Sequence, residues 1–320
     1  MGLNRVSVIV VSYNTRDKLR KCLQAIEPEH ELIVVDNMST DGSPEMVEEE
    51  FPRAKLIRNP ENRGFGAANN QGAAIASGQL LLYLNSDAYA VEGAIERLAQ
   101  PFADPSIAAA GGRLLNLDGS LQESTANRLT LWAVFCEQFY LEKIFPGSSM
   151  LSPYWNTRKI IGYACPADTE QVMGACLMTR ASLEQFDERY FLYCEDTDLC
   201  YRLRQHGRIV YVKDASFTHE LGSSSSADPV KAVIRYNQGK ELYFKIRRGE
   251  MASIICMLLD RAGALMRCFY WCLRALTSPY SNSRTLAQGF WKAVWAPSIG
   301  PMSSFSDTRS SPVPDRPPSE

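Results

Sequence analysis

The first 90 residues alternate between short apolar runs and segments with helical periodicity, and this alternation limits the fold more than any other feature. "VSVIVVSYN" (6–14) is too continuously apolar for a strand with one solvent face, and residues 15–26 then place apolar side chains at helical spacing. The pattern recurs as predicted strands at 31–37, 54–60 and 79–87, and predicted helices at 44–51 and 64–77. This order predicts an α/β fold with a doubly wound, mostly parallel sheet.

Polar residues follow the last apolar position of three predicted strands: Ser12, Tyr13 and Asn14, then Asp36, then Asn85, Ser86 and Asp87. In open α/β sheets, ligands bind beyond the carboxyl ends of the strands. Turn formation alone explains any one of these groups, but three groups in register favour a binding crevice. A carboxylate at Asp87 suits a hard divalent cation, Mg²⁺ or Mn²⁺, that bridges a diphosphate.

A second acidic cluster lies in "FLYCEDTDLCYRLRQHG", where Glu195, Asp196 and Asp198 precede an amphipathic helix. Acids at a helix start interact favourably with its unpaired amides, and Asp198 can pair with Arg202 one turn later. Helix capping accounts for one or two of the three acids. The cluster therefore also predicts a carboxylate that accepts a proton during catalysis.

Six segments together resemble family 2 glycosyltransferases: "VSVIVVSYN", "LIVVDNMSTDGS", "NPENRGFGAANNQGA", "LLLYLNSDA", "MGACLMTRASLEQFDERYFLYCEDTDLCYRLRQHG" and "ASFTHELGSS". More narrowly, they are similar to the bacterial rhamnosyltransferase-type members that build O-antigen and cell-wall linkers. The resemblance covers about residues 6–226. It implies a GT-A fold and an inverting transfer from a nucleotide-diphosphate sugar, here deoxythymidine-diphosphate rhamnose, to a glycan or polyprenyl-linked acceptor.

The resemblance also implies residue roles. Asp196 would be the general base, with Glu195 and Asp198 orienting it or contacting the acceptor. The donor would be bound by Ser12, Tyr13, Asn14, Asp36, Arg63, Gly66, Asn69, Asn85, Ser86 and Asp87. Gly174, Ala175 and Glu170 would line the acceptor or sugar pocket, although Glu170-Gln171 stands where Asp-Trp is common.

The same resemblance implies a divalent cation, Mg²⁺ or Mn²⁺, held by Asp87 and His219. Asn85-Ser86-Asp87 occupies the metal motif of the family, which is usually Asp-x-Asp. Asn85 leaves Asp87 as the ionic ligand from this motif. A catalytically silent sugar-nucleotide-binding scaffold is therefore an alternative function, although a scaffold has no need of a base such as Asp196.

The stretch Gly64-x-Gly66-x-x-Asn69 raises another alternative, because it resembles a dinucleotide fingerprint. It lacks the third glycine, and Pro60 and Glu61 separate it from the preceding strand. We therefore expect the glycines to let a helix pack closely. A sugar nucleotidyltransferase would need a glycine-rich loop after the first strand, which "VVSYNTRDK" lacks.

The remaining regions supply boundaries. We expect a catalytic domain at 1–226, with a nucleotide-sugar half at 1–112 and an acceptor half at 113–226, then a helical region at 227–302 and a disordered tail at 303–320. A hairpin is predicted around Asp118-Gly119. Residues 131–145 form an apolar helix candidate, either core or a surface for a lipid acceptor.

The segment from Met251 to Leu276 is long enough to span a bilayer, but it contains Asp260, Arg261, Arg267 and Arg274. These charges favour a helix lying in the membrane interface, with its arginines reaching the headgroups. Basic residues before it support this interpretation: Lys240, Lys245, Arg247 and Arg248. The alternative is a helical hairpin packed on the catalytic domain.

Charge, cysteine spacing and the N-terminal segment indicate which partners and which location to expect. The net charge of −2 gives no reason to expect nucleic acid. The nine cysteines show no CxxC spacing and are expected to be reduced thiols that pack like small hydrophobic residues. With no secretory leader recognised, we expect a cytoplasmic protein, peripheral on the inner face of the membrane through about 251–300.

Overall fold

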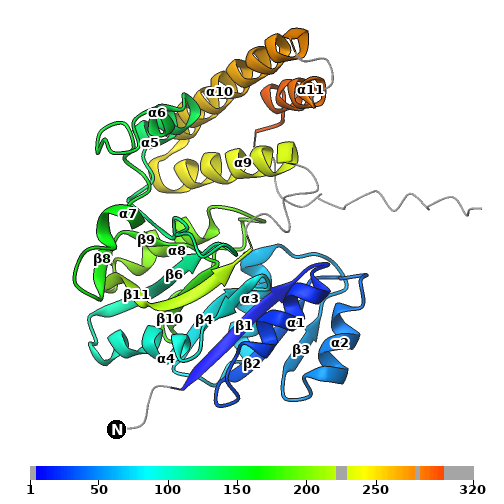
Figure 1. Ribbon diagram of the computed structural model, residues 1–320, viewed down its shortest axis with the longest axis vertical. Coiled ribbons are helices and arrows are strands. Elements are labelled where there is room, and N and C mark those ends of the chain that lie inside the picture. The colour runs from blue at the N-terminus through cyan, green and yellow to red at the C-terminus, as the bar shows by residue number, and fades with distance from the viewer. Residues whose placement is uncertain (1–4, 221–228, 278–281, 299–320) are drawn as a thin grey trace, which may run out of the picture.

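The computed structural model describes residues 5–220, 229–277 and 282–298 and is built around a nine-stranded sheet (Figure 1). Along the sheet lie β3 (Lys55–Arg58), β2 (Glu31–Asp36), β1 (Val6–Ser12), β4 (Leu80–Asn85), β10 (Cys176–Arg180), β6 (Ile107–Leu115), β11 (Arg208–His219) and β5 (Ala88–Ala90), with β8 (Ala167–Thr169) paired to β11. The pairs β3–β2, β2–β1, β1–β4 and β6–β11 are parallel. The prediction of a doubly wound, mostly parallel sheet is confirmed.

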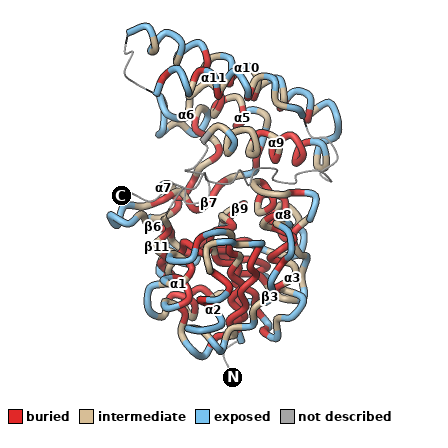
Figure 2. The backbone as a smooth tube through the Cα atoms, turned by 90° about the vertical axis from the view of Figure 1, so that its right-hand side faces the viewer, coloured by how far each residue is buried: buried red, intermediate tan, exposed pale blue. Residues whose placement is uncertain are grey.

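Both faces of the sheet are covered, which explains the continuous apolar runs. Val8 and Val10 pack with Leu19 of α1 (Arg16–Gln24) in one core, whereas Ile9 packs with Leu199 of α8 (Glu195–Leu203) in another. Successive side chains of a strand point to opposite faces, so the apolar residues of β1 alternate between the two cores. Figure 2 shows the buried strands as the centre of this domain.

The other elements of this domain border the sheet. They are α2 (Ser43–Glu50), α3 (Phe65–Ile75), α4 (Ala94–Ala99), the 3₁₀ helix η1 (Gln100–Ala103) and α7 (Thr157–Ile160), with a small sheet of β7 (Thr125–Ala126) and β9 (Gln171–Val172). The helices and strands predicted within residues 6–87 are all present. β10 pairs with β4 and β6, so residues on both sides of position 112 share one sheet.

Register brings the strand ends to a common edge. Ser12 is opposite Asp36, and Val11 is opposite Asn85. The polar residues that follow β1, β2 and β4 therefore start from neighbouring positions, as the parallel arrangement predicts.

Of the two local elements predicted after residue 112, one is present as expected and the other is divided. The turn at Asp118-Gly119 is present, with the Asn116 amide donating to Ser120 O at 2.8 Å. The helix expected at 131–145 is instead two helices, α5 (Leu131–Gln138) and α6 (Leu141–Ile144). Tyr140 between them has a left-handed backbone (φ 58°), which ends the first helix.

A helical lobe packs beside the sheet and consists of α5, α6, α9 (Pro229–Arg248), α10 (Glu250–Thr277) and α11 (Ser283–Val294) (Figure 1). α10 agrees with the helix predicted from Met251 to Leu276. Two of the basic residues grouped before it do not form a basic surface, since Lys240 is fully buried against Asp260 (2.8 Å) and Arg247 is paired with Asp198.

Not every arginine of α10 extends outward as expected. Arg267 does not extend outward, because its guanidinium donates to Gln138 Oε1 at 2.6 Å and to Tyr140. Arg274, in contrast, is exposed. Within the described residues, none of the helices combines the length and apolarity that a membrane crossing requires. The tail predicted at 303–320 lies outside the described residues.

All nine cysteines are free thiols, and seven of them are buried. Cys165 and Cys272 are exposed, contrary to the expectation that all pack like small hydrophobes.

Candidate active site

The ends of β1 and β4 are joined by a chain of three hydroxyl groups. Thr15 Oγ1 lies 3.1 Å from Ser12 Oγ and donates to Ser86 Oγ at 2.9 Å. All three residues are buried. The predicted donor residues Ser12 and Ser86 thus have fixed orientations. Thr15, which sequence reasoning missed, supplies the link.

Asp36 presents a buried acceptor at the end of β2. Its Oδ2 accepts from the Ser39 amide at 2.9 Å, whereas Oδ1 is buried with no hydrogen-bond partner among the described residues. Burial raises the pKa of Asp36, and the hydrogen bonds from Ser39 oppose this shift. A buried carboxylate oxygen of this kind suits a hydrogen-bond donor on a ligand. Next to it, Asn14 is exposed and its Oδ1 accepts from the Thr40 amide, and Tyr13 is half-buried.

Asn37 holds the segment that leads into α3. Its Nδ2 donates to Gly64 O at 3.0 Å, and its Oδ1 accepts from the Arg63 amide at 3.2 Å. The Arg63 side chain is 41% exposed and lies 4.0 Å from Glu188, which leaves its guanidinium accessible to an anion. Asn69 is buried within α3, where its Nδ2 donates to Phe65 O at 3.0 Å and its Oδ1 has no partner among the described residues.

The glycines of this segment serve close packing, as expected. Gly64 has φ 84°, and a Cβ there would lie 2.4 Å from Phe191 O. At Gly66 a Cβ would lie 3.1 Å from Phe186 Cβ. These contacts are with protein backbone and side chains, which gives a reason for the glycines other than a dinucleotide pyrophosphate.

Asp87 and His219 meet where β5 pairs with the end of β11. The Asp87 Oδ1 to His219 Nε2 distance is 3.3 Å, both residues are buried, and Asn85 Nδ2 lies 3.4 Å from the same nitrogen. His219 Nδ1 lies 3.1 Å from Gln122 Oε1. A proton on Nδ1 satisfies Gln122 and directs the lone pair of Nε2 toward Asp87 and Asn85. An imidazole nitrogen and a carboxylate oxygen at this distance are ligand types that bind divalent ions, so the donor set fits one.

Asp196 lies in the first turn of α8. Its Oδ2 accepts from the Gly174 amide at 2.8 Å, and its Oδ1 accepts from the Thr197 amide at 2.7 Å. Burial raises the pKa of Asp196, while these amide hydrogen bonds lower it. The amides stabilise the charged form, and burial makes it a stronger base than an exposed aspartate.

Glu195 differs from its neighbour in protonation. Burial, followed by the charge of Asp196, raises the pKa of Glu195 to about 8. Its Oε2 is buried with no hydrogen-bond partner among the described residues. At neutral pH the proton of the pair therefore resides on Glu195 and the negative charge on Asp196, which separates an acid from a base.

The carboxylate of Asp198 is surrounded by hydrogen-bond donors of the protein. Its side chain is fully buried and accepts from Arg247 Nε and Nη2 at 2.7 and 2.8 Å, from Arg202 Nε at 2.9 Å, and from the Tyr190 hydroxyl. The pair with Arg202 agrees with sequence reasoning. Contact with an acceptor does not fit this geometry, because both oxygens already accept hydrogen bonds from protein groups and are shielded from solvent. Asp198 instead links α8 to α9.

Glu170 is similarly occupied. It forms an ion pair with Arg204, and its Oε2 accepts from the Arg128 amide at 2.6 Å. These contacts attach β8 and β9 to neighbouring segments, and we therefore do not assign Glu170 to the acceptor pocket.

Two hydrogen bonds connect the strand-end groups to Asp196. The backbone amide of Asn85 donates to Ala175 O at 3.1 Å, and the backbone amide of the adjacent Gly174 donates to Asp196 Oδ2. Gly174 and Ala175 thus form the backbone between the Asn85–Asp87 segment and the acidic turn of α8. One compact region therefore contains a cation-type donor set and a carboxylate base.

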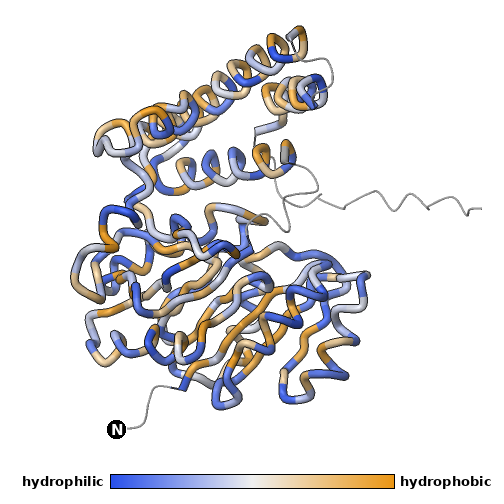
Figure 3. Tube along the Cα trace, in the orientation of Figure 1, coloured by the Kyte–Doolittle hydropathy of each residue, from blue (hydrophilic) through white to orange (hydrophobic). Residues whose placement is uncertain are grey.

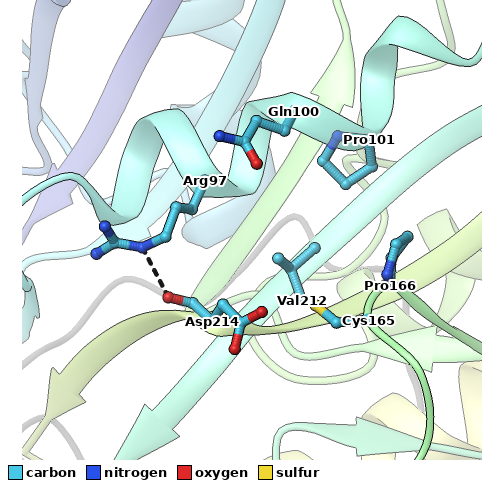
Figure 4. A pocket seen from close by; sticks show the side chains of 7 residues that line it. All are labelled: Arg97, Gln100, Pro101, Cys165, Pro166, Val212 and Asp214. Carbon is cyan, nitrogen blue, oxygen red and sulfur yellow. Dashed lines mark hydrogen bonds between the residues drawn. The ribbon is translucent and has the colours of Figure 1, made fainter.

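Two other features lie apart from this region. Glu27, His30 and Glu96 offer ligand atoms that all lie within 4.8 Å of one another, with His30 Nε2 2.7 Å from Glu96 Oε1. A pocket near α4 is lined by residues that include Arg97, Cys165 and Asp214, with Arg97 donating to Asp214 O (Figure 4). It contains none of the predicted site residues.

Comparisons with known proteins identify a family and several similar chains. Residues 7–162 match the model of the family "Glycosyl transferase family 2". The chain is 26% identical over 267 residues to an N-acetylglucosaminyl-diphospho-decaprenol L-rhamnosyltransferase of Mycobacterium tuberculosis, covering 75% of this chain and 84% of that protein. It is 27% identical over 242 residues to the O-antigen biosynthesis protein RfbC of Myxococcus xanthus, covering 72% of this chain and 18% of that protein.

Among solved structures, the chain is similar to the mannosyltransferase PcManGT from Pyrobaculum calidifontis, solved in complex with GDP-Man and Mn²⁺. The TM-score is 0.54 at 18% identity, over 92% of this chain and 86% of that one. This likeness shows the shared fold, which is that of the GT-A glycosyltransferases.

Proposed function

We propose that this chain, which carries a glycosyltransferase family 2 domain, transfers a sugar from a nucleotide-diphosphate donor to a hydroxyl of a polyprenyl-diphosphate-linked acceptor, with inversion at the anomeric carbon. The observation that supports it most is a pair of hydrogen bonds through adjacent residues. The backbone amide of Asn85 donates to Ala175 O, and the backbone amide of Gly174 donates to Asp196. These two hydrogen bonds connect the carboxylate that we propose as the base with the segment that carries the cation-type donor set.

In this mechanism Asp196 accepts the proton of the attacking acceptor hydroxyl. The Gly174 and Thr197 amides hold both carboxylate oxygens, so the base is oriented before the acceptor binds. The protonated Glu195 beside it avoids a second buried charge. Inversion by direct displacement then needs no covalent intermediate on the protein.

Asp87 and His219 would hold the divalent cation, with Asn85 as a neutral neighbour. When bound, the cation neutralises the negative charge of the departing diphosphate. The unpartnered Oδ1 of Asp36 would accept a hydrogen bond from the base or ribose, and the accessible Arg63 would contact an anionic group of the donor.

For the substrates, the name of the mycobacterial relative supports L-rhamnose as the transferred sugar and a polyprenyl-diphosphate N-acetylglucosamine as acceptor, and the family resemblance implies deoxythymidine diphosphate as the nucleotide of the donor. The test is calorimetry with a panel of nucleotide-diphosphate sugars, with Mn²⁺ and then with EDTA. Product analysis with a short-chain acceptor follows. We expect metal-dependent binding of one donor and a product of inverted configuration. Binding without turnover on any acceptor would instead support a silent scaffold.

We further propose that the lobe contacts the lipid bilayer in which such an acceptor resides. The buried face of α10 carries small or polar residues such as Ser253, Asp260 and Gly263, whereas most of its large apolar side chains are exposed. The exposed apolar residues recur at helical spacing: Met251, Ile254, Ile255, Leu258, Leu265, Phe269, Leu273 and Leu276. Figure 3 displays the hydropathy along this helix.

This arrangement reverses that of an ordinary surface helix, whose apolar stripe faces the core. α10 has 28 residues, so the stripe extends for about 40 Å. Trp291 and Trp295 are also exposed, and tryptophan is typical of membrane interfaces.

Sedimentation with vesicles that contain phosphatidylglycerol tests the contact. The double variant Leu265→Glu, Phe269→Glu should lose binding, whereas Leu117→Glu, an equally exposed apolar site on the distant turn near Asp118, should keep it. Self-association of the wild type that this double variant abolishes, without vesicle binding, would identify a second copy of the chain as the occupant instead.

A further inference from the structure

We propose that α9 positions the catalytic turn of α8, with Gly239 and Arg247 as its positioning residues. This inference rests on the proposed role of Asp196 as the base. Neither residue touches the reacting groups. Gly239 contacts the residues that precede Glu195 and Asp196, and Arg247 contacts Asp198, which follows them.

The turn before the catalytic acids is conformationally unusual. Tyr193 and Cys194 have φ 74° and 66°, so two consecutive residues with side chains adopt the left-handed conformation. This conformation is unfavourable for a residue with a Cβ and persists only where surrounding contacts enforce it. Glu195 follows directly and starts α8. The direction of α8 therefore depends on what holds these two residues.

α9 holds the N-terminal side of the acidic pair. A Cβ at Gly239 would lie 2.6 Å from Tyr193 O and 3.3 Å from Cys194 Cβ, so only glycine permits this approach. One turn earlier on α9, the ring of Tyr236 packs edge-on against that of Tyr193, with centroids 6.1 Å apart. The backbone of the left-handed turn thus lies against α9.

The C-terminal side is held by an ion pair. Arg247 donates two hydrogen bonds to the fully buried carboxylate of Asp198, two residues after Asp196. Its guanidinium also lies 5.3 Å from the ring centroid of Tyr201. A bidentate pair at a buried carboxylate fixes both distance and orientation. Lysine would keep the charge but not the second hydrogen bond.

Contacts at residues 193 and 198 therefore enclose the base and set the direction in which it faces the acceptor. Gly249 alone separates α9 from α10, which carries the exposed apolar stripe. The surface proposed to meet the bilayer and the helix that holds the base belong to one helical hairpin.

The test compares Arg247→Met and Arg247→Lys with Arg248→Met, which removes the same charge at the next, exposed position of α9. The assay uses deoxythymidine-diphosphate rhamnose and a water-soluble short-chain polyprenyl-diphosphate N-acetylglucosamine. The number of donor-binding sites from calorimetry normalises each rate to folded protein. We expect kcat per site to fall about tenfold in Arg247→Met and less in Arg247→Lys, with donor Kd within about twofold of wild type.

The pH profile separates positioning from general loss of stability. A loosened turn admits water to Asp196, which relieves burial, so the acid limb of kcat should move to lower pH in Arg247→Met. Arg248→Met should retain the wild-type profile. Loss of folded protein would lower the number of sites but would not move this limb.

Amide hydrogen exchange of residues 193–203 gives a readout that does not depend on catalysis. We expect faster exchange there in Arg247→Met and Gly239→Ala, and unchanged exchange in Arg248→Met. Wild-type exchange together with wild-type kcat per site in Arg247→Met would overturn the inference. If the wild type transferred no sugar, the proposed function would fail, and exchange would still decide whether α9 holds the turn.

Discussion

The backbone amide of Gly174 donates a hydrogen bond of 2.8 Å to Oδ2 of Asp196. This contact joins a loop that is itself attached to Asn85 with the first turn of α8. The amide is an uncharged donor fixed in position, so it stabilises the carboxylate without competing for the proton that the base removes.

Gly174→Ala should therefore impair catalysis more than stability. A Cβ at this position would lie 3.2 Å from Asp196 Cβ and 3.4 Å from Oδ2, so the carboxylate must shift by a few tenths of an ångström. We expect kcat to fall about tenfold with donor Kd nearly unchanged. Gly162→Ala is the control, because a Cβ there meets nothing within 4 Å. Equal kcat values in the two variants would remove Gly174 from the site.

Asp196→Asn should abolish transfer while preserving donor binding. Asparagine can still accept from the Gly174 amide, but it cannot take a proton from the acceptor, and general base catalysis contributes about 10²–10⁴-fold. Rate measurements and donor calorimetry on the same preparation check this. Asp168→Asn, which removes an exposed acid paired with Arg208, should retain full activity. Wild-type turnover by Asp196→Asn would exclude Asp196 as the base.

The raised pKa of Glu195 predicts that the stability of the folded chain depends on pH in an unusual way. Its pKa is about 8 in the folded chain, so the folded state retains a proton that the unfolded state releases above its ordinary pKa near 4.5. Folded protein binds more protons in this window, and the contribution of Glu195 to the free energy of unfolding therefore decreases as pH rises from about 4.5 to about 8.

Glu195→Gln removes this titration. Relative to wild type, the variant should gain stability progressively up to pH 8, by about 2–4 kcal/mol. Urea unfolding at pH 5, 6.5 and 8 measures the difference. A difference that is constant with pH would mean that Glu195 is ionised in the folded chain.

Much of the fold and part of the site follow from local sequence patterns. Apolar runs and helical spacing predict β1 to β4 and α1 to α3, because both sheet faces are covered and periodicity records burial. The placement of Ser12, Asp36 and Asn85 at one edge follows from parallel pairing, which brings equivalent strand ends together.

Pairings between distant segments were not predictable in the same way. The i,i+4 spacing reveals Asp198–Arg202, but Arg247 reaches the same carboxylate from 49 residues further along. Lys240 and Arg247 belong to a stretch that the sequence suggests is a basic surface. In the structure Lys240 is buried and Arg247 partly buried, each in an ion pair. A sequence pattern gives the periodicity of a helix, whereas the partner of each charge depends on how the lobe packs. Tyr140 likewise ends a helix through its backbone conformation, without a glycine or proline to signal it.

The cation site leads to a final prediction, which uses the neutral residue at its edge. Asn85 Nδ2 lies 3.4 Å from His219 Nε2, so a carboxylate at this position would face the same point as Asp87 and His219. Asn85→Asp should therefore bind Mn²⁺ about tenfold more tightly in the presence of a nucleoside diphosphate, because ligand charge raises affinity for hard cations. His219→Gln should weaken binding, and EDTA should abolish it. Calorimetry in a His30→Gln background excludes the cluster of Glu27, His30 and Glu96. Asn282→Asp, at an exposed position in the helical lobe, controls for an added charge elsewhere. Unchanged Mn²⁺ affinity in both Asn85→Asp and His219→Gln would assign the cation to a different set of ligands.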